Sequence, residues 1–170
     1  MSENKLPEPW LRGTLPEVSP VQRAVLHALQ LAQEDLERWC ASLTDEQLCA
    51  RPAGMAPVAF HLRHIARSID RLLTYAEGRL LEPAQIAALK AEMGSGAKGS
   101  ELFGELVSAL EQAAARIRRF GEAQLSEPRK VGARGLPTTV AGLLVHVADH
   151  TQRHVGQAIT TAKFVVAQEA

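Results

Sequence analysis

The segment Leu143–Gln157 reads LLVHVADHTQRHVGQ and belongs to a stretch that runs on from Thr138 without a proline. Its apolar residues recur every three or four positions, which is the period of an α-helix with one buried face and not that of a strand. Thr138 or Thr139 is placed to cap this helix, because a threonine side chain accepts hydrogen bonds from the first free backbone amides. The pattern predicts a long C-terminal helix that ends near Val165.

Several segments upstream show the same helical period. Helices are predicted over residues 19–43, 57–77 and 100–124, with a shorter helical piece over 83–92. Ser19 before Pro20 is a typical helix start, and Thr44–Gln47 has the pattern of a capping box that opens a short turn. No stretch shows a convincing two-residue alternation, so no strand is predicted.

Four long helices predict an all-α protein with a four-helix bundle. The polar connection before the last helix contains Pro128, Gly132, Gly135 and Pro137 and is longer than an up-and-down bundle requires, which indicates an irregular topology with a crossing connection. Residues 1–18 are predicted to form an extended N-terminal arm, attached to the body by its Trp and Leu at positions 10 and 11. Residues 19–170 are predicted to form one domain.

Composition excludes some classes of partner. The chain has 19 basic and 19 acidic residues and a formal net charge of zero, so it lacks the basic footprint needed for nucleic acid or an anionic membrane. No apolar run has the length of a membrane span, and the first residues, MSENKLPEPW, do not resemble a secretory signal. Cys40 and Cys49 match neither a disulfide framework nor a zinc ribbon, which favours a reducing, cytoplasmic location.

The predicted last helix carries three histidines that could bind a metal ion. His146, His150 and His154 follow one another at intervals of four, so that neighbouring pairs lie on one helix face and can chelate one divalent ion. Measured from the apolar stripe at about 100° per residue, His154 lies within roughly 40°, His150 at roughly 80° and His146 at roughly 120°. This favours His150 and His154 as a ligand pair.

A second group of histidines lies on the helix predicted over 57–77. Here His61 lies about 60° from the apolar stripe and His64 about 120°, so periodicity alone favours His61 as a third ligand. The remaining histidine, His27, is interpreted as an ordinary core or surface residue. Thr151 stands where a zinc-protease motif has its glutamate base, so that motif is absent.

At these residues the chain resembles the DinB family, also called DinB/YfiT-like. The resemblance is carried by the segment 143–157, with two histidines four apart and then Gly-Gln, and more weakly by VAFHLRHIA at residues 58–66. It extends over about residues 19–165. It implies an irregular four-helix bundle, a zinc or nickel ion, or a similar divalent ion, bound by three histidines, and a homodimer. Carried over by position, the three ligands are His64, His150 and His154.

The resemblance leaves some residues without an assigned role. His61 and His146 lie one turn from the implied ligands and could contact those ligands or the substrate. Val155 stands where the family often has arginine. No catalytic residue is identified.

Three histidine ligands leave an open coordination position, which is typical of catalytic sites. Two reactions follow: metal-assisted hydrolysis, and transfer of a low-molecular-weight thiol that ionises at the metal. The resemblance extends to mycothiol- or bacillithiol-dependent S-transferases, and no general base is evident, since Asp149 projects about 100° away from His150. We therefore expect a thiol S-transferase acting on small molecules. A hydrolase, or a non-catalytic metal-binding stress-response bundle, remains an alternative.

Overall fold

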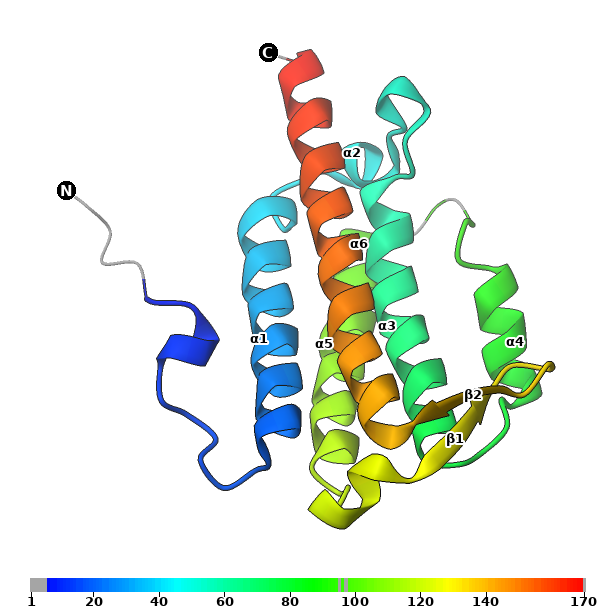
Figure 1. Cartoon of the computed structure of the whole chain (residues 1–170). Coiled ribbons are helices and arrows are strands. Elements are labelled where there is room, and N and C mark those ends of the chain that lie inside the picture. The colour runs from blue at the N-terminus through cyan, green and yellow to red at the C-terminus, as the bar shows by residue number, and fades with distance from the viewer. Residues whose placement is uncertain (1–5, 95, 97, 170) are drawn as a thin grey trace.

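The computed structural model describes residues 6–94, 96 and 98–169. Within this part of the chain, long helices form a bundle (Figure 1). They are α1 (Pro20–Cys40), α3 (Val58–Ala76), α5 (Gly99–Ile117) and α6 (Val140–Glu169). The predicted all-α four-helix bundle is confirmed.

The order of the helices around the bundle is irregular. α6 packs against both α1 and α3, and α5 packs against α3 and, less extensively, α1, so that α1 and α3 lie on a diagonal. In Figure 1, α1 and α6 run upward whereas α3 and α5 run downward. Neighbours α3 and α5 are therefore parallel, and the chain must travel back along the bundle between them. The described part of this connection, residues 77–94, contains α4 (Pro83–Lys90).

The helix starts follow local capping chemistry. Ser19 and Gln22 form a reciprocal capping box at α1, and Thr44 and Gln47 do the same at the short α2 (Asp45–Cys49), as the sequence predicts. At α6 the hydroxyl of Thr139 accepts a hydrogen bond from the amide of Gly142 at 3.1 Å. The last of these caps fixes the start of α6, the helix that carries His150 and His154, whereas α3 begins after Pro57 without a side-chain cap.

The connection between α5 and α6 contains a hairpin that the sequence pattern did not predict. A 3-10 turn (Glu122–Ser126) precedes β1 (Pro128–Val131), which pairs antiparallel with β2 (Leu136–Thr139). The strands are too short to show alternation, and each contains a proline, which is a poor strand former. Gly132 and Gly135 make the turn with φ of 69° and 59°, values that favour glycine. The predicted helix over 100–124 is correspondingly shorter and ends at Ile117.

The described part of the N-terminal arm, residues 6–18, is fixed to α1 by polar contacts and contains a 3-10 turn (Pro9–Leu11). Arg12 donates two 2.7 Å hydrogen bonds to the carboxylate of Glu34, and the hydroxyl of Thr14 lies 3.0 Å from the buried ring of His27. The expectation that Trp10 and Leu11 attach the arm is wrong, because these residues are 61% and 56% exposed.

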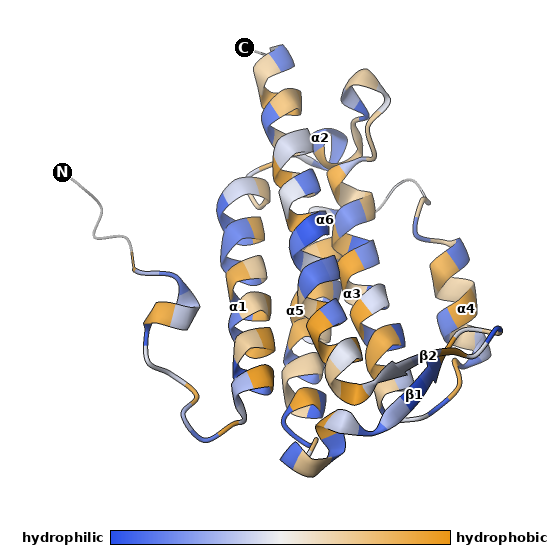
Figure 2. Cartoon of the chain, in the orientation of Figure 1, coloured by the Kyte–Doolittle hydropathy of each residue, from blue (hydrophilic) through white to orange (hydrophobic). Residues whose placement is uncertain are grey.

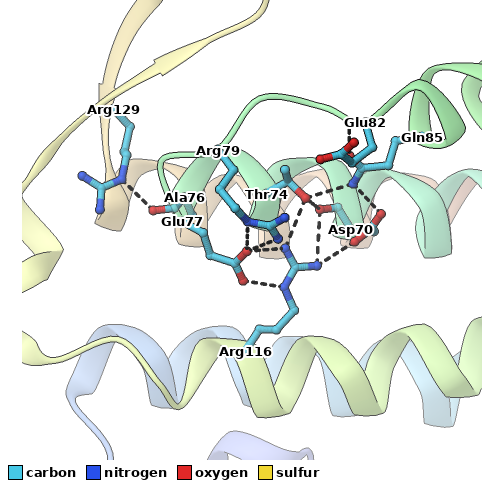
Figure 3. A network of polar contacts seen from close by, with 9 residues as sticks. All are labelled: Asp70, Thr74, Ala76, Glu77, Arg79, Glu82, Gln85, Arg116 and Arg129. Carbon is cyan, nitrogen blue, oxygen red and sulfur yellow. Dashed lines mark hydrogen bonds and ion pairs between the residues drawn. The ribbon is translucent and has the colours of Figure 1, made fainter.

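A polar network joins the parallel neighbours α3 and α5 (Figure 3). Arg116 on α5 donates to Asp70 at 2.7 Å and to Glu77 at 2.6 Å, both on or just after α3. Elsewhere the helices meet through apolar side chains such as Leu62, Leu106 and Leu144, all 1% exposed or less. No helix in the described ranges combines the length and apolarity of a bilayer span.

Candidate metal centre

The candidate centre lies where α3 and α6 pack side by side. His61 and His64 come from the first two turns of α3, and His150 and His154 come from the middle of α6. Each pair is three or four residues apart, so both members lie near one face of their helix. Packing of the two helices turns these faces toward each other.

His64, His150 and His154 form one compact cluster. Each offers a ring nitrogen, and these nitrogens all lie within 4.8 Å of one another. The Nε2 atoms of His64 and His150 are 2.8 Å apart. All three side chains are partly exposed, so the cluster is open to solvent on one side.

The other ring nitrogens of two of these histidines have partners outside the cluster. Nδ1 of His64 lies 2.7 Å from Oε2 of Glu92, and Nδ1 of His154 lies 3.0 Å from Nδ1 of His61. Because Nδ1 is engaged in both residues, Nε2 is the nitrogen left to face the cluster. Such outer partners fix the ring orientation of histidines that bind metals.

The donor set fits a divalent transition-metal ion. Imidazole is a preferred ligand of zinc and nickel. Zn–N bonds are about 2.0–2.1 Å long, so two nitrogens on one tetrahedral ion lie roughly 3.3 Å apart. The 2.8 Å between His64 and His150 and the upper limit of 4.8 Å for all three nitrogens are compatible with this value. Three histidines also leave a coordination position for a further ligand.

Burial and neighbouring charge lower the pKa of His61, His150 and His154 and so favour their neutral forms, which are the forms that bind metals. Burial, with a smaller contribution from the neighbouring His64, lowers the pKa of His61 to about 4 and that of His150 to about 4. Burial, followed by His64 and His150, lowers the pKa of His154 to about 3. The imidazoles of these three residues are therefore neutral throughout the physiological pH range.

The two additional histidines have different surroundings. His61 is 3% exposed and contacts His154, so it lies against the cluster on the side of the protein interior. His146 is half exposed, its ring lies 5.4 Å from that of His150, and its Nδ1 lies 3.5 Å from Asp149. Asp149 also accepts a 2.8 Å bond from Arg153.

Glu92 is a site residue that the sequence analysis missed. It follows α4 in a turn, is 3% exposed, and bonds both His64 and, at 2.6 Å, Arg71. A carboxylate at the end of a short helix resembles an ordinary surface residue. A sequence signal exists only on α3, where His64 and Arg71 are seven residues apart and so share a face.

A pocket of about 560 Å³ lies beside His61, and none of the three clustered histidines is among its lining residues. Its lining comes from the segment before α3 and from α6, and includes Met55, His61, Arg153, Gln157 and Thr160. This volume lies in the range of small-molecule sites.

Comparisons with known proteins agree with this architecture. A solved structure, described as the conserved protein of locus from Enterococcus faecalis, superposes with a TM-score of 0.73 at 20% identity, and the match covers 88% of this chain and 99% of that one. At this identity the likeness shows the fold alone. A search of curated proteins found no match. The sequence model of the DinB superfamily matches residues 28–158, which include every histidine of the cluster, and the chain therefore belongs to the DinB superfamily.

Proposed function

We propose that the chain binds a divalent ion, zinc or nickel, through His64, His150 and His154, and transfers low-molecular-weight thiols to electrophilic small molecules. The observation that carries the proposal is the convergence of three imidazole nitrogens from two helices within 4.8 Å. When bound, such an ion lowers the pKa of a thiol that reaches it and so supplies a nucleophile at neutral pH.

The neighbouring pocket supports a small-molecule substrate. It shares His61 with the surroundings of the cluster and offers polar groups from Arg153, Gln157 and Thr160. Low-molecular-weight thiols carry amide or carboxylate groups, and these side chains could hold such groups while the sulfur faces the histidines. Arg153 is 56% exposed, so its guanidinium remains accessible although it also contacts Asp149.

The carboxylates near the cluster favour thiol transfer over hydrolysis. Hydrolysis calls for a base beside the attacking water. Both oxygens of Glu92 are engaged by His64 and Arg71, and Asp149 pairs with Arg153 and contacts His146. Neither is placed as a free base. Thiol transfer does not call for such a base, because the ion itself favours the ionised form of the thiol.

The test combines metal content with thiol transfer. The purified protein is stripped of metal, reloaded with Zn²⁺ or Ni²⁺, and assayed with bacillithiol, mycothiol, glutathione or cysteine and the electrophile monochlorobimane. We expect conjugation that depends on added metal and is lost in the His150→Ala/His154→Ala variant. His146→Ala, on the same helix and half exposed, is the matched control and is expected to retain its metal.

Full metal content in a folded double variant would refute the metal site. Stoichiometric metal binding without turnover of any thiol would refute the transferase proposal and leave a metal-binding bundle.

A further inference from the structure

Glu92 is a buried carboxylate with an uncommon set of partners. Its side chain is 4% exposed, Oε2 lies 2.7 Å from Nδ1 of His64, and Oε1 accepts a 2.6 Å bond from Arg71. Removing a carboxylate from water is unfavourable unless its oxygens are paired and hydrogen-bonded. Here both oxygens are satisfied, and one of the two partners is a histidine of the cluster.

The segment that carries Glu92 is held by arginines. Arg63, Arg67 and Arg71 occur at intervals of four on α3 and therefore share one face. Arg63 donates to the carbonyl of Gly94, and Arg67 donates to that of Ala88 at 3.0 Å. With the Arg71–Glu92 pair, these bonds fix the backbone on both sides of Glu92.

Apolar packing does not account for this attachment. None of the residues of α4 is buried, and Figure 2 shows apolar residues along this helix. Ile86, Leu89 and Met93 are 43%, 44% and 48% exposed. Glu92 is the one residue between Pro83 and Gly94 whose side chain is buried. The arginine contacts thus place a single carboxylate against His64.

We infer that Glu92, oriented by Arg71, is a positioning residue that holds His64 with Nε2 directed into the three-histidine cluster. This inference rests on the proposed metal-binding function. By accepting the Nδ1–H of His64, the carboxylate selects the tautomer whose Nε2 has a free lone pair and strengthens that nitrogen as a ligand. Partners of this kind contribute about 10- to 100-fold to metal affinity.

The rival explanation is that Glu92 merely fastens α4 to α3. Glu105 on α5 provides a control, because it pairs at 2.7 Å with Arg67, the same arginine that donates to Ala88 in the attachment. Glu105→Gln frees Arg67 and so loosens the attachment without removing a partner of His64. Glu92→Ala weakens both the attachment and the support of His64, and the isosteric Glu92→Gln keeps a hydrogen-bond acceptor without the charge.

The experiment measures Co²⁺ and Zn²⁺ dissociation constants of the full chain by competition with a chromophoric chelator, with circular dichroism to check folding. We expect affinity to fall about 10- to 100-fold in Glu92→Ala, to recover in part in Glu92→Gln, and to stay within about twofold of wild type in Glu105→Gln. In metal-free protein at about pH 8, the imidazole ¹⁵N shifts of His64 are expected to report Nδ1–H in the wild type and a shift toward Nε2–H in Glu92→Ala.

The outcomes separate this inference from the proposed function. Wild-type protein that fails to bind either ion overturns the proposed function. Wild-type binding with unchanged affinity in Glu92→Ala, or an equal loss in Glu105→Gln, overturns the role of Glu92 alone.

Discussion

Thr151 follows His150 and is completely buried. Within the described residues its hydroxyl has no hydrogen-bond partner. Leaving a buried hydroxyl unpaired is unfavourable, whereas an apolar group of the same shape is tolerated there. The hydroxyl therefore contributes nothing favourable to the packing of α6.

We expect Thr151→Val to leave the free energy of unfolding unchanged or to raise it by about 1 kcal/mol. Urea denaturation measures the change, and metal content is expected to match wild type because the neighbouring imidazole is untouched. A loss of more than about 1 kcal/mol would mean that the hydroxyl has a partner after all.

A second residue-scale prediction concerns acid. Since the pKa of His61 falls to about 4 in the folded chain and is about 6.5 when unfolded, the unfolded state binds more protons between these values. Stability is therefore highest above about pH 6.5 and is lost as pH falls toward 4. We expect His61 to account for roughly 1–2 kcal/mol of the stability that metal-free protein loses between about pH 7 and 5, as measured by urea denaturation. His150 and His154, whose pKa values are lowered in the same direction, add to that loss.

His61→Gln should reduce the slope of that profile without abolishing it, because glutamine does not titrate whereas His150 and His154 still do. A profile of unchanged slope in His61→Gln would assign the acid sensitivity to other groups.

The choice between His61 and His64 shows what the apolar periodicity of α3 predicts and what it does not. This periodicity favours His61 over His64 as the inward residue, and His61 is indeed the more buried of the two. The apolar stripe of α3, however, points between two neighbours, because α3 packs on both α5 and α6. The cluster lies only toward α6. Position in the family motif favours His64, which lies 2.8 Å from His150.

At the scale of elements, the helices follow from the sequence because their apolar stripes are long and their caps are local. The β1–β2 hairpin and the turn that contains Glu92 could not be predicted from the sequence in this way. β1 and β2 depend on pairing with each other, and the buried Glu92 is paired with Arg71 and His64 of α3. Contacts between distant segments of this kind leave no periodic pattern in one sequence.

Arg116 tests how strongly α5 is held to α3. Its guanidinium is 15% exposed and bonds Asp70 and Glu77 (Figure 3). Arg116→Met leaves both carboxylates without their principal partner, and we expect a loss of about 1–3 kcal/mol, less than for a fully buried pair because Asp70 is half exposed.

The matched control is Arg79→Met, which removes a 56% exposed arginine from the same Glu77. Its effect is expected to stay below about 1 kcal/mol. Equal losses in the two variants, measured by chemical denaturation, would contradict the special role of Arg116.

At the scale of the whole molecule, the proposed ion links two helices and should stabilise the fold. A ligand that binds only the folded state at 100 times its dissociation constant adds about 2.7 kcal/mol. For a domain of this size that corresponds to a rise in Tm of about 5–10 °C.

Thermal melts with Zn²⁺, Ni²⁺ or a chelator measure this rise. We expect it to disappear in the His150→Ala/His154→Ala variant and to persist in His146→Ala. A rise of the same size in all three proteins would indicate binding elsewhere.

The two histidines that meet at 2.8 Å are 86 positions apart in the sequence. During synthesis, α3 therefore leaves the ribosome long before α6 has been made. Until then, His61 and His64 lack the histidines of α6 as neighbours. The centre is completed only when the last helix docks. The proposed ion can therefore meet all three histidines only in the finished fold, and would be drawn from the metals present at that stage.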